Sequence, residues 1–503
     1  MTLEELLQNV DDYELLKGTD DVNIVEICVD SRSVKTGDLF VAIKGVDVDG
    51  HKFIGKAIEN GAVAIVLEDE AFMAKDETVT IINVENSRKA LAHLAAAFYG
   101  FPARKLIVIG VTGTDGKTTT STLIHHILNE AGHKTGLITS INAVIGDRIL
   151  ETGFHTTTPD ALSIQNYLNE MVRAGCEYAV IETSSHGLAQ YRVEACEYDV
   201  AVLTNITSEH LDFHKSQEEY KRAKAHLFEL LSISYKKKNV PKISILNKDD
   251  PNYKDFKSYS GDRHFSYGLN KNADFWADDI SHENAILSFF VHSPRGKFKI
   301  ESPLLGKFNV YNILAACAVA YSQQIPINVF VEAIKTINSI RGRMELITHE
   351  KGDFRVIIDF AHTAYALEQA LKTARTFTTG EIHVVFGSAG LRDIKKRREM
   401  GIVAGKFADK IYITAEDPRT EDVNVIIDEI AQGCLEQDRT EGQDFFRIPD
   451  RTQAIENALL KAEKGDTVLC CGKAHETTMC YGKEEQSWSE YNAVHKGLKK
   501  RGI

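Results

Sequence analysis

The stretch GVTGTDGKTTTS, residues 110–121, contains residue types that together bind phosphate. It follows the apolar run KLIVI and precedes TLIHHILNEAG, whose apolar residues recur at helical spacing. Gly113 and Gly116 let the backbone approach an anion closely. Lys117 can neutralise phosphate charge, and the Thr118 hydroxyl can ligate Mg²⁺. Because the positive end of the helix dipole also faces such a turn, the stretch predicts a site for a nucleotide polyphosphate.

The loop departs from the usual pattern G-x-x-x-x-G-K-S/T, because Val111 occupies the position of its first glycine. Its own pattern resembles the nucleotide loop of the Mur ligases, ATP-dependent amide-forming enzymes of peptidoglycan precursor synthesis. That resemblance implies that Thr114, Asp115 and Thr119 also contact ATP, although Asn is commoner than Asp at position 115. Folylpolyglutamate synthetases share a similar loop, so the loop alone leaves both families open.

The segment DSRSVKTGDLFVAIKGVDVDGHKFI, residues 30–54, resembles the N-terminal domain of MurE-type ligases, which holds the UDP end of the substrate. The resemblance implies that Ser31 and Arg32 contact the uridine diphosphate and that His51 lies nearby. An ordinary strand–turn–strand explains the same residues equally well, since KTGD is also a good turn. The segment therefore takes its functional meaning from the rest of the chain.

Two further motifs resemble the parts of the family that contact the muramoyl-peptide substrate. HTTTPDALSIQ carries a Thr-Thr-Pro element with Thr156 and Thr157 as contacts. VIETSSHGLAQYRV is the most specific match, and it implies that Ser184 and Arg192 contact the phosphates or the peptide of the substrate. In the same motif Glu182 ends an apolar run and resembles the family's magnesium ligand. A carboxylate at a strand end suits Mg²⁺, which binds hard oxygen ligands together with phosphate and water.

The segment TNITSEHLDFHKSQEEYKRAKAHLF adds a histidine and a lysine to the expected metal site. By resemblance, His210 helps to bind a second Mg²⁺, and Lys224 carries CO₂ as a carbamate (N6-carboxylysine). The chemistry is consistent, because an ammonium repels a metal whereas a carbamate is a carboxylate-like anion on a long arm. Without the motif, Lys224 would be interpreted as a solvated lysine on a helix. The prediction of a carbamate therefore depends on its place in the motif. The resemblance implies that the catalytic residues are Lys117, Glu182, His210 and Lys224, and that the metal ligands are Thr118, Glu182, His210 and the carbamate of Lys224.

Other family positions surround the nucleotide. LLGKFNVYNILAA resembles the segment near the adenine, with Asn309 and Asn312 as candidate contacts. Arg343, in IRGRMELI, matches a family position at the start of the third domain. DFAHTAYALEQAL resembles a motif whose Asp and His, here Asp359 and His362, face ATP across the domain cleft.

A last group of motifs concerns the incoming amino acid. GSAGLRDIKKRREMG, AEDPRTED and GKAHET resemble the family segments that hold meso-diaminopimelate. The candidate contacts in them are Arg392, Glu416, Asp417, Arg419, Gly472 and Glu476. A guanidinium binds a carboxylate with two hydrogen bonds, so Arg419 favours meso-diaminopimelate, which carries a carboxylate that lysine lacks. Asp417 replaces an Asn of the family, and its added charge favours a basic amino acid such as L-lysine.

These motifs lie on alternating apolar runs and amphipathic helices. The first hundred residues mix short strands (IVEICVDS, DLFVAIKG, VAIVLED and VTIINV) with helical stretches such as SRKALAHLAAAFYG. KLIVIGV, YAVIETS, VAVLTNIT and KISILNKDD are typical of buried parallel strands, with AILSFFVHS and GKFKIESP as antiparallel additions. RVIIDFAH, EIHVVFGSAG, KIYITAEDPR and DTVLCCGKAHE form a third set. Open α/β sheets bind ligands beyond the carboxyl ends of their strands, where the polar motifs fall.

The chain is therefore predicted to be an α/β protein of three domains, which agrees with its length of 503 residues. The expected domains are an N-terminal mixed α/β domain for the UDP-substrate (1–100), a central P-loop-type domain with a parallel sheet for ATP (101–338), and a C-terminal Rossmann-like domain for the amino acid (339–503).

The composition is that of a soluble globular protein, with a mean hydropathy of −0.21. No run of about 20 apolar residues predicts a membrane span, and the acidic N-terminus lacks the features of a signal peptide, so we expect a cytoplasmic protein. A net charge of −13 argues against general nucleic-acid binding. The eight cysteines form no Cys-x-x-Cys pair and are typical of buried thiols.

The resemblance covers almost the whole chain, and the chain is identified as a member of the Mur ligase family of the MurE type. This implies ATP-dependent addition of a diamino acid, meso-diaminopimelate rather than L-lysine, to UDP-N-acetylmuramoyl-L-alanyl-D-glutamate through an acyl phosphate. ATP, Mg²⁺ and the carbamate of Lys224 are the implied cofactors, and we expect a monomer. The alternatives are another Mur-family ligase, a folylpolyglutamate synthetase-like enzyme and a non-catalytic nucleotide-binding subunit. The DSR segment and ETSSHGL argue against the folate enzyme, and the complete phosphate and metal set argues against lost catalysis.

Overall fold

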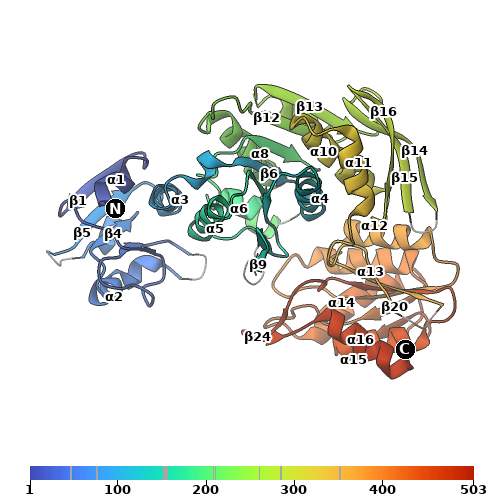
Figure 1. Ribbon diagram of the computed structural model, residues 1–503. Helices are drawn as coiled ribbons and strands as arrows, with labels where there is room; N and C mark the ends of the chain where they lie inside the picture. The colour runs from blue at the N-terminus through green and yellow to red at the C-terminus, as the bar shows by residue number, and fades with distance from the viewer. Residues whose placement is uncertain are drawn as a thin grey trace.

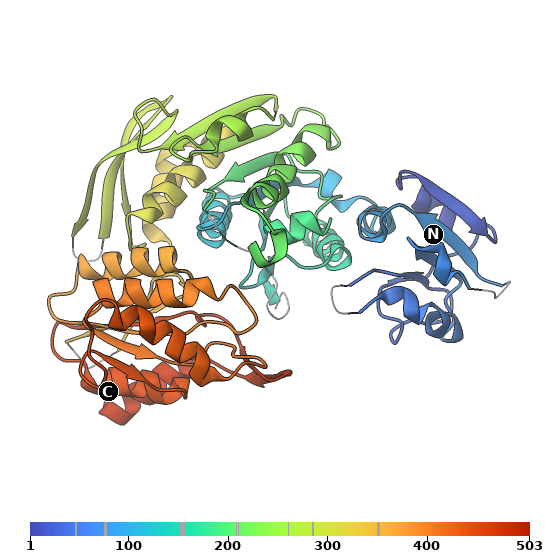
Figure 2. The ribbon, with the colours of Figure 1, turned by 180° about the vertical axis from the view of Figure 1, so that it is seen from behind.

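The computed structural model describes residues 1–45, 48–74, 78–150, 157–207, 209, 211–259, 261–283, 286–349 and 353–503. Within these residues the chain forms sheets of 5, 11, 6 and 2 strands in three successive α/β blocks (Figure 1). The blue N-terminal block and the orange-to-red C-terminal block lie on opposite sides of the green central block in both views (Figures 1 and 2). The predicted fold class, α/β in three domains, is confirmed.

The N-terminal sheet has the order β1-β5-β4-β3-β2 and is parallel except for β1. Its elements are α1 (Leu3–Leu7), β1 (Tyr13–Lys17), β2 (Ile27–Cys28), β3 (Leu39–Val41), η1 (Gly50–Phe53), α2 (Ile54–Glu59), β4 (Ala64–Leu67), η2 (Glu70–Phe72), β5 (Thr80–Val84) and α3 (Ser87–Phe98). Strands β2 to β5 fall in the four predicted segments. Strand β1 was not predicted, because its side chains are exposed or half-buried and form no apolar run.

The central sheet has the order β16-β15-β14-β13-β12-β11-β6-β10-β7-β8-β9. Its strands are β6 (Ile107–Thr112), β7 (Thr135–Ile138), β8 (Ala143–Ile145), β9 (Arg148–Leu150), β10 (Tyr178–Glu182), β11 (Val200–Leu203), β12 (Ile243–Asn247), β13 (Arg263–Gly268), β14 (Phe275–Glu283), β15 (Ile286–Ser293) and β16 (Gly296–Ser302). The part from β7 to β14 is parallel, and both margins are antiparallel. The sheet is thus mixed, with β15 and β16 as the predicted antiparallel additions.

Helices cover both faces of the central sheet and follow its strands along the chain. They are η3 (Pro102–Lys105), α4 (Lys117–Glu130), α5 (Ala161–Arg173), α6 (Ser185–Ala189), α7 (Leu211–His214), α8 (Gln217–Ile233), α9 (Tyr253–Lys257), α10 (Phe308–Ser322) and α11 (Ile327–Thr336). Because the sheet is covered on both faces, β10, β11 and β12 are buried at every position. This explains why the sequences of these three strands are continuous apolar runs.

The C-terminal sheet has the order β17-β18-β22-β19-β20-β21 and is parallel except for β17. Its elements are β17 (Glu345–Ile347), β18 (Arg355–Asp359), α12 (Ala364–Arg375), β19 (Ile382–Phe386), α13 (Lys395–Phe407), β20 (Lys410–Ile413), α14 (Val423–Leu435), β21 (Phe445–Arg447), α15 (Arg451–Lys461), β22 (Thr467–Cys471) and α16 (Glu490–Arg501). A separate hairpin, β23 (Thr478–Tyr481) and β24 (Glu484–Ser487), precedes α16.

The sheet order brings the predicted motifs to common edges. Strand β6 lies between β10 and β11, so the glycine loop after β6, Glu182 at the end of β10 and the turn after β11 meet at one edge. Seven of the eight cysteines are buried and Cys480 is half-buried, all as free thiols. None of the helices in the described ranges has the length and apolar character that crossing a membrane requires.

Candidate active site

Gly113 and Gly116 adopt backbone conformations that favour glycine. Gly113 has a φ of +147° and Gly116 a φ of +82°. A Cβ on Gly113 would lie 1.8 Å from Thr204 Oγ1, and a Cβ on Gly116 would lie 2.3 Å from Asn312 Oδ1. Helix α4 begins at Lys117, directly after the second glycine. The loop therefore combines backbone without side chains, at the two glycines, with a helix N-terminus, which is the geometry of an anion site.

The residues after β11 hold the loop in this shape. Asn205 accepts one hydrogen bond from the Thr114 N–H at 2.8 Å and another, on Oδ1, from the Asp115 N–H at 3.0 Å. The Thr204 hydroxyl donates to the Asp115 carbonyl at 2.7 Å. Lys117 Nζ donates to the Thr114 carbonyl at 2.7 Å, so its ammonium lies against the loop that it is predicted to serve.

Thr118 and Glu182 meet although 64 residues separate them. Thr118 Oγ1 lies 3.1 Å from Glu182 Oε1, and Glu182 Oε2 accepts a hydrogen bond from the Ser140 N–H at 3.0 Å. Glu182 is 2% exposed. Arg343, from the C-terminal block, donates to Thr118 Oγ1 at 2.9 Å. A hydroxyl and a buried carboxylate at the phosphate loop are hard oxygen ligands, so these residues fit Mg²⁺.

Lys224 is not a solvated lysine, since its side chain is 1% exposed. Its Nζ donates to the Gly113 carbonyl at 2.6 Å and lies 4.4 Å from the centroid of the Tyr220 ring. Burial, with the charge of Lys117 added to it, holds the pKa of Lys224 well below the usual value for lysine. A lowered pKa favours the neutral amine, which is the form that can react with CO₂.

The predicted adenine residues lie beneath the glycine loop. Asn312 Oδ1 accepts a hydrogen bond from the Thr120 hydroxyl at 3.3 Å, and its Nδ2 donates to Asn309 Oδ1 at 2.9 Å. Asn309 in turn donates to the Leu305 carbonyl at 2.7 Å. Thr119 is buried in the first turn of α4. The structure thus brings the two amides to the loop, while their contact with adenine stays a prediction.

His362 reaches from the C-terminal block to the central block. Its Nε2 lies 3.4 Å from Glu209 Oε1. Burial lowers the pKa of His362, but the carboxylates of Glu209 and Glu416 together outweigh that effect, so the net pKa is raised. The Asp359 carboxylate instead binds groups of its own block, because it accepts hydrogen bonds from the N–H groups of Met344 (2.7 Å) and Ala361 (2.8 Å). Burial raises the pKa of Asp359.

Of the predicted uridine diphosphate contacts, Arg32 is exposed and pairs with Asp30, with Nη2 2.7 Å from Oδ2. The hydrogen bonds from Arg32 lower the pKa of Asp30 to about 2. Ser31 is buried, and its carbonyl accepts a hydrogen bond from Asn60 Nδ2 at 2.7 Å. These contacts fix the turn between β2 and β3.

His51 lies inside the N-terminal block and is 2% exposed. Its Nδ1 is 2.7 Å from Asp49 Oδ1, and its Nε2 accepts a hydrogen bond from the Glu68 N–H at 3.1 Å. Both ring nitrogens therefore have partners within the block, which gives His51 a structural role there, while its closeness to uridine diphosphate stays a prediction.

Thr158, which was not predicted, connects the muramoyl-peptide set to Glu182. Its hydroxyl donates to the Glu182 carbonyl at 3.0 Å and lies 2.9 Å from Ser184 Oγ. Arg192 donates to the Thr158 carbonyl at 2.6 Å. Thr157 is half-buried beside it. Two other predicted residues, Thr156 and His210, lie outside the described residues.

Lys473, a second residue that sequence reasoning missed, organises the predicted amino-acid site. It is fully buried, and its Nζ lies 2.9 Å from Asp417 Oδ1 and 2.5 Å from Glu476 Oε2. Glu416 is 6% exposed, and burial raises its pKa. Gly472 has a φ of +105°, and a Cβ there would lie 2.1 Å from Glu416 Oε2. The loops after β20 and β22 are thus in direct contact.

The two predicted arginines lie on separate loops at this edge. Arg419 has a φ of +54° and is anchored to the β23–β24 hairpin, since its N–H donates to the Cys480 carbonyl at 3.0 Å and its carbonyl accepts from the Gly482 N–H at 2.7 Å. Arg392 is exposed on the loop after β19. Both guanidinium groups therefore remain candidates for a carboxylate of the incoming amino acid.

A buried ion pair that the sequence did not reveal supports the same loops. Arg451 and Glu490 are both fully buried, with Nε 2.9 Å from Oε2. Arg451 also donates to the Ala415 carbonyl at 3.2 Å and to the Cys471 carbonyl at 2.6 Å, directly before Glu416 and Gly472. A charged residue at a helix start resembles an ordinary surface position, so only the packing shows its role.

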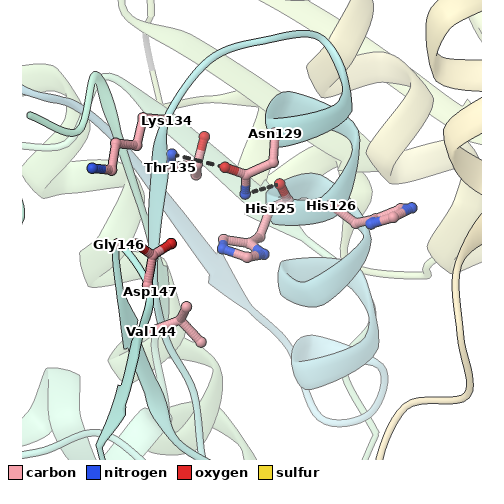
Figure 3. Close-up of a pocket in the computed structure, with 8 residues that line it drawn as sticks. All are labelled: His125, His126, Asn129, Lys134, Thr135, Val144, Gly146 and Asp147. Atoms are coloured by element: carbon pink, nitrogen blue, oxygen red, sulfur yellow. Dashed lines mark hydrogen bonds between the residues drawn. The ribbon is translucent and has the colours of Figure 1, made fainter.

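A cavity of about 300 Å³ lies apart from these residues, between the second half of α4 and β7–β8 (Figure 3). Asn129 closes one side, accepting from the Thr135 N–H at 3.2 Å and donating to the His125 carbonyl at 2.9 Å. Burial lowers the pKa of His125 to about 4, so its ring is neutral at physiological pH, and the charged residues of the lining are Lys134 and Asp147. None of the predicted site residues lines this cavity.

Similarity to known proteins extends over most of the chain. Three family models match the chain: "Mur ligase family, catalytic domain" at residues 23–99, "Mur ligase middle domain" at 111–320 and "Mur ligase, glutamate ligase domain" at 342–474. The UDP-N-acetylmuramoyl-L-alanyl-D-glutamate--2,6-diaminopimelate ligase of Bacillus licheniformis is 41% identical, covering 99% of both chains. A UDP-N-acetylmuramyl-tripeptide synthetase of Roseiflexus is 41% identical, covering 95% of both.

Among solved structures, one of a UDP-N-acetylmuramoyl-L-alanyl-D-glutamate--2,6-diaminopimelate ligase has a TM-score of 0.68 and 28% identity. The similarity covers 100% of this chain and 99% of that one. The likeness to relatives and structures therefore extends through all three blocks, and the chain belongs to the Mur ligase family.

Proposed function

We propose that this chain is an ATP-dependent ligase that adds meso-diaminopimelate to UDP-N-acetylmuramoyl-L-alanyl-D-glutamate in peptidoglycan precursor synthesis. The observation that carries the proposal is the cluster of Thr118, Glu182 and Arg343 at the glycine loop. It joins a phosphate site of the central block to an arginine of the C-terminal block. Full-length relatives at about 40% identity with this activity in their names support the substrate assignment.

The first step is transfer of the γ-phosphoryl group of ATP to the side-chain carboxylate of the substrate's glutamate, which gives an acyl phosphate and ADP. Phosphoryl transfer depends mainly on positioning and on stabilisation of charge. The glycine loop and the N-terminus of α4 bind the phosphates, and Lys117 neutralises part of their charge. Arg343 lies where it can neutralise charge that develops on the transferred group.

In the second step, the amine of the amino acid attacks the acyl phosphate carbon. A tetrahedral intermediate forms, phosphate leaves with the bonding electrons, and the amine loses its proton as the amide forms. Arg392 and Arg419 bind carboxylates of the amino acid, and Glu476 binds an ammonium. This arrangement orients the attacking amine.

Magnesium would be held by Thr118, Glu182, His210 and the carbamate of Lys224. When bound, it neutralises phosphate charge and fixes the geometry of the phosphates. Thr118 and Glu182 support this proposal through their contact of 3.1 Å, and Lys224 supports it through its buried position at the Gly113 carbonyl.

The contacts of Asp417 favour meso-diaminopimelate over L-lysine. Asp417 was expected to favour lysine through its negative charge, but the Lys473 ammonium, shared between Asp417 (2.9 Å) and Glu476 (2.5 Å), offsets part of that charge. Arg419 and Arg392 then supply positive charge for the carboxylate that lysine lacks. We further propose a cytoplasmic monomer with domain borders at 100/101 and 338/339.

A phosphate-release assay with the UDP-dipeptide, ATP and Mg²⁺ tests the proposal. Meso-diaminopimelate should stimulate phosphate release strongly, and L-lysine should do so weakly or not at all. Absence of release with every diamino acid, from protein that binds ATP, would overturn the ligase assignment. Equal or greater stimulation by L-lysine would overturn only the choice of amino acid.

A further inference from the structure

A cavity of about 210 Å³ lies at the junction of the N-terminal and central blocks. Arg88 and Leu91 of α3 form one side, and Gln190 and Arg192, directly after α6, form the other. The junction is packed, since α3 shares a hydrophobic core with Ala161 at the start of α5. The cavity is therefore preformed between two blocks that contact each other firmly.

Two guanidinium groups line this cavity, and their hydrogen-bond acceptors are all neutral. Arg192 donates to the Thr158 carbonyl at 2.6 Å and to Gln190 Oε1 at 2.8 and 3.2 Å. Arg88 donates to the Lys44 carbonyl at 3.0 Å. In the part of the chain that the structure describes, neither arginine forms an ion pair with a carboxylate.

The carboxylates near the two arginines accept hydrogen bonds from other groups. Glu68 Oε2 accepts from the Ser87 N–H at 2.8 Å. Asp160, which lines the wall, uses its carboxylate to cap α5 by accepting from the N–H of Ser163 at 3.0 Å and from its hydroxyl at 2.6 Å. Burial lowers the pKa of both arginines, and for Arg192 the charge of Arg88 lowers it further. The charges of Glu68 and Asp160 oppose this lowering in part, without a hydrogen bond to either guanidinium among the described residues. Two like charges thus face a partly buried cavity with only distant carboxylates to balance them, and an anion bound there would stabilise both.

We propose that Arg88 joins Arg192 in holding an anionic group of the UDP-linked substrate at the junction of the two blocks. This inference rests on the proposed function. Guanidinium groups bind phosphate and carboxylate with paired hydrogen bonds, and the substrate offers both a diphosphate and a glutamate carboxylate. The cavity lies between the predicted uridine segment and Glu182. Ile43 of that segment lines it, and on the other side Arg192 contacts Thr158, which contacts the Glu182 carbonyl.

The test is equilibrium binding of UDP-N-acetylmuramoyl-L-alanyl-D-glutamate to the full-length protein, measured by calorimetry without ATP. Arg88→Gln should weaken binding about 10- to 100-fold, the range for loss of charge-assisted hydrogen bonds. Arg88→Lys should have an intermediate effect, because it keeps the charge but not the paired donors. Lys89→Gln, which removes the same charge from the next position of α3, is the matched control and should bind like wild type.

A second titration, with UDP, distinguishes the two anionic groups. If Arg88→Gln weakens UDP binding by the same factor, the diphosphate is the group held; if UDP binds unchanged, it is the carboxylate. An unchanged dissociation constant for the dipeptide substrate in Arg88→Gln, or an equal loss in Lys89→Gln, overturns the inference. If Arg88→Gln does not fold, the same binding measurements are made on Arg88→Lys. Failure of the wild-type protein to bind the substrate would instead refute the proposed function.

Discussion

At the scale of single residues, Lys224 combines complete burial with a position at the glycine loop. Burial lowers its pKa well below the usual value for lysine, which favours the neutral amine that can form a carbamate. Lys224→Ala should lower kcat about 100-fold or more, the size of effect seen when one charge-stabilising group is lost. Added acetate or formate should restore part of the activity by occupying the vacated place. The measurement is phosphate release with and without the small carboxylate.

Two observations provide the controls for Lys224. Lys224→Arg keeps a long basic side chain but forms no carbamate, so it should be as inactive as Lys224→Ala. In CO₂-free buffer the wild-type activity should fall, more at lower pH where the ammonium form returns, and bicarbonate should restore it. Full activity of Lys224→Arg would contradict the carbamate, as would a wild-type rate that is indifferent to CO₂.

At the scale of elements, Arg451 and Glu490 join the first residues of α15 and α16 to the ends of β20 and β22. Arg451→Met leaves Glu490 buried without its partner and should cost about 3–5 kcal/mol of unfolding free energy. It should also raise KM for the amino acid more than KM for ATP, because the loops after β20 and β22 carry the predicted amino-acid contacts. Urea unfolding and steady-state kinetics measure the two effects.

The exposed ion pair of Arg398 and Glu436 is the matched control for the buried pair of Arg451 and Glu490. Arg398→Met removes a similar ion pair from the surface and should cost less than about 1 kcal/mol. The chain has two tryptophans, and Trp488 Nε1 donates to Glu490 at 3.1 Å. Trp276→Phe therefore leaves Trp488 as the one fluorescent reporter, beside the buried ion pair. Equal losses of unfolding free energy in Arg451→Met and Arg398→Met would show that the buried ion pair contributes no more than an exposed one.

Elements buried on both faces were predictable from sequence, whereas exposed or short ones were not. Strands β10, β11 and β12 are entirely buried and form apolar runs. Strand β24 is exposed at all four positions, and β9 has no buried position, so neither leaves a hydrophobic pattern. The glycine loop was predictable because local backbone geometry demands its residues. Lys473 and Thr158 were missed because their partners come from distant segments that only the packed fold brings together.

At the scale of the whole molecule, Arg343 and His362 connect the C-terminal block to the central block. Arg343 donates to Thr118 Oγ1 at 2.9 Å, and His362 lies 3.4 Å from Glu209. Catalysis requires that the amino-acid site of one block meet the phosphate site of the other. These two contacts therefore mark the interface at which the active site is assembled.

Arg343 also shares Thr118 with the proposed metal site, which leads to a prediction about nucleotide binding. When the Thr118 hydroxyl ligates Mg²⁺, the Arg343 guanidinium should transfer to a phosphate oxygen, where charge develops during phosphoryl transfer. Arg343→Gln should then lower kcat about 100-fold or more while changing the ATP dissociation constant only a few-fold. Arg341→Gln removes the same charge two residues away, where Arg341 stacks on Tyr491 at 4.9 Å, and should leave kcat within about twofold. If Arg343→Gln instead weakens ATP binding as much as it lowers kcat/KM, the arginine binds the ground state and gives no additional stabilisation to the transition state.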